Sequence, residues 1–553
     1  MRKSIWILCA FTSLAIILFG TSCADFLKAR NRASSTMQSE RPAEEDSANY
    51  QKQESLDFQA GGEATRELAP SPGASGAGPA QTPPPAAGGT DIPNAEPYDL
   101  TFFENYGVNP FISTEDEKTS TFGMDVDTAS YVIARRFLTD GNMPDPASIR
   151  TEEFINYFDQ DYEDMRGDGV FSVTVEGAES EFGQPNYHLL RIGVKASEAS
   201  LEDRPPANMI FVVDVSGSMN REDRLEQVKR SLGMLAGNLK RGDRIGLVVY
   251  GSTGQVISDL TSDHDAILSA IAQLMPGGST NAEEGLRLAY EMARSNFEPE
   301  NVNRIILCSD GVANVGVTDA DTILRQIKDD ALDGITLTTI GFGMGNYNDV
   351  LMEKLANHGD GMYYYIDSDN EAQRVFGEGA AQMLMVLASD AKVQVEFNEE
   401  TVDRFRLLGY ENRRLTEEQF RDDTVDAGEV GAGQCVTALY EIRVRDESLS
   451  DSRAQVATVR VRYENLRTRE VEEFETPVTV RDLNREFDEA SDGFQFIAAV
   501  AEFAEVLKGS YWAQESSFSD VLRVATPVAE NLGDDEQEFC DLVESAVRLE
   551  DAT

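Results

Sequence analysis

The chain has 553 residues and a mass of 60.8 kDa, which is enough for about three domains of ordinary size. Its 98 acidic and 48 basic residues give a formal net charge of −50. This balance argues against a nucleic-acid-binding protein, because phosphates are neutralised by a basic surface, and against docking on an anionic membrane through protein charge. With 41% hydrophobic residues the chain can still bury a sizeable core. Because only eleven basic residues are Lys, solubility in concentrated salt is a further hypothesis.

The first residues predict an export signal. Arg2 and Lys3 precede an apolar run over residues 5–19, which is shorter than the roughly 20 residues that span a bilayer. Small residues and then Cys23 follow, an order that resembles a bacterial lipobox. The resemblance implies that Cys23 carries a lipid, and Ala24 after it implies sorting to the outer membrane, so we expect a lipid-anchored protein of the bacterial cell envelope. The alternative is an ordinary secreted protein that is cleaved nearby.

Changes in composition divide the rest of the chain. A stretch rich in Ser, Ala, Gly, Pro and Glu follows Cys23, and such a stretch cannot bury enough apolar surface to fold. Three widely spaced cysteines remain beyond it, so no disulfide framework is visible. We predict a signal peptide (1–22), a lipidated linker (23–96), a leading arm (97–205), a central domain (206–388), a β-rich trailing arm (389–483) and a terminal helical region (484–553).

The central domain alternates short apolar runs with amphipathic stretches. Leucines and alanines recur at helical spacing over residues 225–239 and 286–293. The apolar runs lack polar alternation, as strands covered on both faces do, and we therefore predict a doubly wound α/β domain with a parallel sheet. The runs are MIFVV (209–213), RIGLVVY (244–250), RIILC (304–308), ITLTTI (335–340) and MYYYI (362–366).

Polar residues follow two of these runs at the points where the strands end. Asp214, Ser216 and Ser218 follow the first run, and Asp310 follows RIILC. The turn over residues 277–281 can present a hydroxyl at the same edge, where doubly wound sheets bind ligands. Oxygen ligands without His or thiolate favour Mg²⁺, with Mn²⁺ or Ca²⁺ possible. The alternative is a serine-rich turn that caps a helix.

The DVSGS sequence at 214–218, together with Thr280 and Asp310 further along the chain, resembles the metal-ion-dependent adhesion site of von Willebrand factor type A (VWA) domains. The resemblance implies that the metal is bound by Asp214, Ser216, Ser218 and Thr280, with Asp310 binding directly or through water. Two carboxylates only neutralise a divalent ion, so the ion stays electrophilic and can accept a carboxylate from a partner protein.

The flanking sequences resemble those of YfbK-like lipoproteins over roughly residues 109–547. This likeness implies an exported protein with a VWA domain. It rests on TSTFGMDVDTASYVIARRFLTDG and RTEEFINYFDQDY before the central domain, and on RLLGYENRRL and VDAGEVGAGQCVTALYEI after it.

The two arms are predicted to pair with each other. In the leading arm, Asp127 or Thr128 can cap a helix that runs through Leu138, and Thr151 can cap one through Phe158. This arm has too few strands for a stable sheet of its own, so we predict one β-sandwich built from both arms, with the central domain inserted. The expected strands are 170–179, 187–196, 391–398, 434–444, 454–463 and 474–480, and the expected terminal helices are 494–509, 517–532 and 538–549.

Rival motifs have simpler interpretations. Arg-Gly-Asp at 241–243 spells the tripeptide that integrin receptors recognise, but it is typical of a turn. GFGMGN at 341–346 is similar to a dinucleotide-binding loop, but it is typical of a strand-to-helix loop. The acidic stretch 367–371 is typical of a helix start rather than of a calcium loop. The sequence has three His and neither a G-x-S-x-G nor an H-E-x-x-H motif, so we do not expect an enzyme. We expect a metal-dependent protein-binding module. The alternatives are an enzyme or envelope-complex assembly factor that uses the same metal site, and a structural envelope protein.

Overall fold

The computed structural model describes residues 103–165, 167, 169–221, 224–311, 327, 334–344, 347–483 and 486–552. All of them belong to one structural unit, Ala80–Thr553. The predicted signal peptide, Cys23 and the predicted linker lie outside the described residues. No helix in the described part of the chain has both the length and the apolar composition needed to cross a bilayer.

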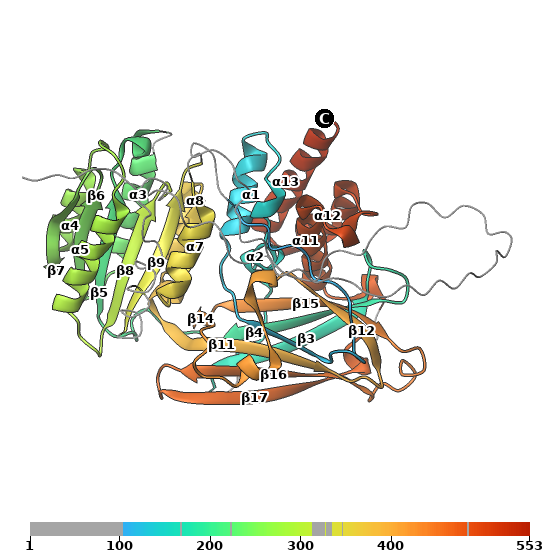
Figure 1. Ribbon diagram of the computed structural model, residues 1–553. Coiled ribbons are helices and arrows are strands. Elements are labelled where there is room, and N and C mark those ends of the chain that lie inside the picture. Colours follow the sequence, from blue (N-terminus) through green and yellow to red (C-terminus); the bar gives the residue numbers. More distant parts are fainter. Residues whose placement is uncertain are drawn as a thin grey trace, which may run out of the picture. The chain divides into compact units, whose positions relative to one another are not determined.

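The central domain is built on a six-stranded sheet in the order β10-β9-β8-β5-β6-β7 (Figure 1). The five predicted apolar runs are its parallel strands, as expected. The edge strand β7, which the sequence analysis did not predict, pairs antiparallel with β6. The strands are β5 (Ala207–Asp214), β6 (Arg244–Tyr250), β7 (Gly254–Thr261), β8 (Val302–Ser309), β9 (Ile335–Phe342) and β10 (Tyr363–Ile366).

Helices cover both faces of this sheet. Met209, Phe211 and Val213 of β5 share a core with α3 and α4, whereas Ile210 and Val212 face α5 and α7. Alternate side chains of one strand therefore enter two cores, which explains the continuous apolar run and confirms the doubly wound fold. Among the described residues of this domain the α-helices are α3 (Arg224–Gly237), α4 (His264–Ala272), α5 (Ala282–Ser295), α7 (Asp349–His358), α8 (Asp369–Ala372) and α9 (Ala380–Leu384).

The two arms form a β-sandwich, as predicted. In one sheet β4 of the leading arm pairs antiparallel with β15 of the trailing arm, and in the other β2 pairs antiparallel with β11. Apolar side chains from both sheets form one shared core. The first sheet contains β1 (Ile112–Ser113), β12 (Val402–Leu408), β15 (Cys435–Val444), β4 (His188–Ala196) and β3 (Phe171–Glu179). The second contains β13 (Arg414–Leu415), β2 (Thr119–Gly123), β11 (Val386–Phe397), β16 (Gln455–Asn465) and β17 (Glu470–Thr479), with β14 (Gly428–Gly431) on β11.

The three predicted terminal helices are present and pack with the two helices of the leading arm. Phe158, which follows α2, makes edge contacts with Phe496 of α11 and Phe539 of α13, and Phe154 lies near Phe503 of α11. Contacts between these rings pack the terminal helices against the leading arm. The helices are α1 (Ala129–Thr139), α2 (Thr151–Tyr157), α11 (Asp492–Lys508), α12 (Phe518–Leu532) and α13 (Asp534–Glu550), and a short α10 (Glu417–Phe420) lies in the trailing arm.

Neither predicted cap in the leading arm makes a side-chain capping bond, although both helices exist and Thr128 occupies the N-cap position of α1. Thr128 precedes α1 without a side-chain capping bond, and the Asp127 carboxylate instead accepts a hydrogen bond from Tyr363 N in β10. Thr151 is the first residue inside α2, and its hydroxyl lies 3.1 Å from Glu505 of α11. The side chains of Asp127 and Thr151 therefore bond to residues far along the chain instead of capping a helix.

Candidate metal centre

Two neighbouring parallel strands bring two carboxyl groups to one edge of the central sheet. β5 ends at Asp214, and β8 ends at Ser309, immediately before Asp310. The register pairs Val213 with Cys308, so the two acids follow their strands at the same level. Asp214 is 0% exposed and Asp310 is 2% exposed. The two carboxylates that the sequence analysis placed at one sheet edge are therefore adjacent and buried.

The two serines link these acids by hydrogen bonds. Ser216 N donates to Asp214 Oδ1 over 2.7 Å, and the hydroxyls of Ser216 and Ser218 lie 2.9 Å apart. Ser218 Oγ donates to Asp310 Oδ1 over 3.0 Å. Ser216 precedes the short helix η2 (Gly217–Asn220) but makes no side-chain capping bond, so its hydroxyl faces the acids rather than a helix end. Four of the five predicted site residues thus form one hydrogen-bonded group.

Thr280 belongs to the turn between α4 and α5. Two backbone bonds hold this turn against the loop after β5: Gly217 N donates to Gly278 O over 3.0 Å, and Gly277 N donates to Val215 O over 2.7 Å. Gly278 has a φ of 90°, which side chains rarely adopt, so glycine is required where the two loops meet. Among the described residues the half-buried Thr280 hydroxyl makes no hydrogen bond with the other four side chains. The turn that carries Thr280 is bonded to the loop after β5, and the role of Thr280 as a metal ligand stays a prediction.

The sequence analysis missed Arg224, the first residue of α3. Its Nη1 donates to Asp310 Oδ2 over 2.8 Å, both side chains are almost fully buried, and its Nη2 donates to the Met344 carbonyl. A basic residue at a helix N-terminus is disfavoured by the helix dipole unless an anion lies nearby. The position of Arg224 at a helix start therefore indicates a nearby acid, and this is the signal that the sequence offered.

The two acids carry more negative charge than their surroundings balance. Burial and then the neighbouring Asp310 raise the pKa of Asp214 to about 7, against hydrogen bonds from Ser216 and Ser309. Burial also raises the pKa of Asp310, although Arg224 opposes the shift. Such a group of buried carboxylates and hydroxyls fits a hard divalent cation, which would supply the missing positive charge. Asp214, Ser216, Ser218, Thr280 and Asp310 are the residues that could hold it.

The rival motifs have the structures expected of them. Asp243 of the Arg-Gly-Asp tripeptide is fully buried against Arg204, in the turn before β6. Ser368 accepts a hydrogen bond from Glu371 N and starts α8, and Asp367 is paired with Arg135 rather than forming a calcium loop. The GFGMGN stretch joins β9 to α7, with residues 345 and 346 outside the described part.

Comparison with known proteins also points to a VWA domain. The family model described as von Willebrand factor type A domain matches residues 208–378, and one described as von Willebrand factor matches 98–191. This chain therefore contains a VWA domain, a type generally involved in protein–protein interaction and often binding a divalent metal at its adhesion site. A third model, described as uncharacterized protein YfbK, C-terminal, matches residues 382–549.

The similarity to one bacterial protein extends over most of the chain. Uncharacterized protein YfbK of Escherichia coli (strain K12) is 33% identical over 472 residues, which are 80% of this chain and 80% of that protein. The chain belongs to the YfbK family.

Other similarities are more distant. Inter-alpha-trypsin inhibitor heavy chain H1 of Sus scrofa is 32% identical over 177 residues, 30% of this chain and 20% of that protein. Among solved structures, von Willebrand factor type A from Catenulispora acidiphila aligns with a TM-score of 0.38 and 12% identity over 66% of this chain and 87% of that chain. The inhibitor heavy chain is named as part of an inhibitor rather than as an enzyme.

Proposed function

We propose that this protein is a metal-dependent binding module, which holds Mg²⁺ at Asp214, Ser216, Ser218, Thr280 and Asp310 and engages a partner protein through an acidic side chain. The observation that carries the proposal is the continuous set of hydrogen bonds from Asp214 through the two serines to Asp310. Mn²⁺ or Ca²⁺ would be bound by the same oxygen atoms with altered strength.

The charge of the site favours an acidic partner group. Two carboxylates and the buried Arg224 together carry a net charge of −1, and a divalent ion changes this to +1. A carboxylate from outside can then complete the coordination of the ion. The whole chain carries a net charge of −50, so the face of the partner around that carboxylate should be basic.

We propose binding rather than catalysis at this site. General acid–base chemistry needs a titratable group within hydrogen-bond reach of the reacting atoms. The two acids would be occupied by the ion, and the other described groups at the site are serines, Arg224 and the buried Tyr250. Arg does not exchange protons at physiological pH, and burial raises the pKa of Tyr250 well above its usual range.

Affinity capture from detergent-solubilised envelope tests the binding proposal. The protein is immobilised in Mg²⁺ or in chelator and compared with Asp214→Ala and with the control Asp259→Ala, an exposed acid on β7. We expect a partner that is retained only with Mg²⁺ by the parent and the control, and lost by Asp214→Ala. A partner retained equally by Asp214→Ala would overturn the proposal, and so would Mg²⁺-dependent turnover of a substrate that Asp214→Ala abolishes.

We further propose that a lipid on Cys23 anchors the protein in the bacterial cell envelope, at the outer membrane. The support is the short apolar run followed by small residues and Cys23. Mass spectrometry of the mature N-terminus should find an acylated Cys23 in the membrane fraction. Cys23→Ser should release the protein from that fraction, and retention of the variant there would contradict the anchor.

A further inference from the structure

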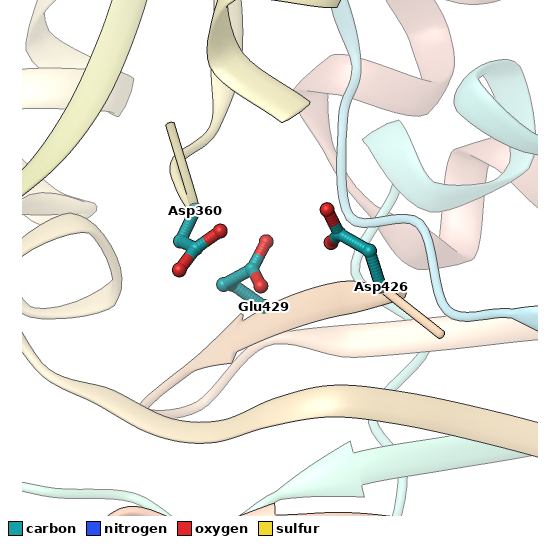
Figure 2. Close-up of side chains that lie close together, drawn as sticks. All are labelled: Asp360, Asp426 and Glu429. Atoms are coloured by element: carbon teal, nitrogen blue, oxygen red, sulfur yellow. The ribbon is translucent and has the colours of Figure 1, made fainter. Parts of the chain in front are cut away.

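A second group of acidic side chains lies away from the candidate metal centre. Asp360 lies in the turn between α7 and β10, whereas Asp426 and Glu429 lie before and within β14 of the trailing arm. One carboxylate oxygen of each lies within 4.8 Å of the others, and the three side chains point toward a common space in Figure 2. The group is formed from segments more than sixty positions apart in the sequence.

The charge of Glu429 is unbalanced. Its side chain is buried, with 8% of the residue exposed, and it forms no hydrogen bond or ion pair with the described residues. Burial and then Asp360 and Asp426 raise its pKa well above the usual range. The cation that opposes the shift, Arg413, donates to Asp125 over 2.7 Å and is thus engaged elsewhere. The Glu429 side chain makes no bond of its own among the described residues and is directed at Asp360 and Asp426, which indicates a cation that binds among the three carboxylates.

The number and type of the ligands favour one cation. Ca²⁺ takes six to eight oxygen ligands, carboxylates among them, in a flexible geometry. Mg²⁺ binds at about 2.0–2.1 Å and usually keeps several waters with one or two carboxylates, and Zn²⁺ favours nitrogen and sulfur ligands. We propose that Asp360, Asp426 and Glu429 bind a Ca²⁺ ion that joins the VWA domain to the β-sandwich.

The topology makes this site separate from the first. β10 is parallel to β9, so a turn that leads into β10 lies at the edge where the parallel strands begin. Asp214 and Asp310 lie at the opposite edge, where the strands end. β14 pairs with β11, the strand that follows the VWA domain, so an ion at the second site would tie the domain to the trailing arm.

The test uses the full chain with Asp214→Ala, so that the first site cannot take up metal. Calorimetry of this Asp214→Ala protein, which is the parent for the variants below, should show uptake of one Ca²⁺. It should bind Ca²⁺ more tightly than Mg²⁺. Adding Glu429→Gln or Asp360→Asn should weaken Ca²⁺ binding at least tenfold, whereas adding Asp446→Asn, an exposed acid elsewhere in the trailing arm, should leave it unchanged. Asn tolerates the left-handed backbone of Asp360 (φ 44°), so this variant should keep the turn intact.

Thermal unfolding of the same variants separates ion binding from misfolding. In chelator Glu429→Gln should melt at or above the temperature of the Asp214→Ala parent, because it removes a buried acid whose ionisation is opposed by burial and by its acidic neighbours. With Ca²⁺ the order should reverse, since the parent gains stability and the variant does not. No Ca²⁺ uptake in the Asp214→Ala parent, uptake unaffected by Glu429→Gln, or tighter binding of Mg²⁺ than of Ca²⁺ would overturn the inference. None of these results bears on partner capture at the first site.

Discussion

Arg224 donates to one oxygen of Asp310 over 2.8 Å, while Ser218 donates to the other oxygen over 3.0 Å. The oxygen bound by Ser218 belongs to the predicted metal centre, and the other faces a fixed cation. Arg224 thereby neutralises one of the two buried acids before any metal binds. It also repels a divalent ion, so it should set the affinity of the site as well as its stability.

Replacing Arg224 should have opposite effects on stability and on metal affinity. Arg224→Met leaves Asp310 buried without its partner, which should lower the free energy of unfolding of metal-free protein by about 3–5 kcal/mol. Mg²⁺ should bind the variant more tightly than the parent and restore part of this loss. Urea unfolding in chelator and in Mg²⁺ measures both effects.

Arg230 on the same helix is the matched control. Its side chain is about half exposed and pairs with the exposed Asp369, so Arg230→Met should cost no more than about 1 kcal/mol. Equal losses in the two variants, or weaker Mg²⁺ binding by Arg224→Met, would contradict the role assigned to Arg224.

The raised pKa of Asp214 predicts how stability depends on pH without metal. The folded protein holds this proton up to about pH 7, whereas the unfolded chain releases it near the ordinary value of 3.8. The folded state therefore loses stability as the pH rises from about 4 to 7, by at most about 4 kcal/mol at 1.36 kcal/mol per pKa unit. In chelator, Asp214→Asn should be more stable than the parent at pH 8.5, and the difference should shrink as the pH falls toward 4. A difference that grows as the pH falls would contradict this assignment.

A buried arginine couples the sandwich to the terminal helices. Arg406 of β12 donates to Glu441 of β15 over 2.8 Å and to Glu505 of α11 over 2.9 Å, and all three side chains are nearly buried. Arg406→Met removes the cation that both acids share and should cost about 3–5 kcal/mol in urea unfolding. Arg404→Met, two residues away on the same strand with a partly exposed pair to Asp403, should cost no more than about 1 kcal/mol. Similar costs for both variants would show that the coupling is weak.

The elements that the sequence predicted well are those that a single segment specifies. β5 is apolar on both faces because it lies between two helical layers, so its pattern and its polar end at Asp214 were recognisable. β7 was missed because its side chains are exposed or half-buried and show no clear alternation. β12 carries charged residues, among them Arg406, that are neutralised by distant partners, so it did not have the pattern of a strand.

What could not be predicted depends on residues far apart in the chain. Nothing near Arg224 or Asp310 in the sequence shows that they meet across 86 positions. The three carboxylates at Asp360, Asp426 and Glu429 come together only when the trailing arm folds against the VWA domain. Thr128 and Thr151 look like caps locally, and only the folded chain shows that neither caps its helix through its side chain.

The most direct measurement is anomalous diffraction from crystals of this protein grown with Mn²⁺, an ion that takes the same oxygen ligands as Mg²⁺. The account predicts an anomalous peak within bonding distance of Ser216, Ser218 and at least one of Asp214 and Asp310, with a water or a neighbouring carboxylate in the remaining coordination position. A fully formed loop after β5 without such a peak, in crystals whose Mn²⁺ concentration saturates other VWA domains, would contradict it.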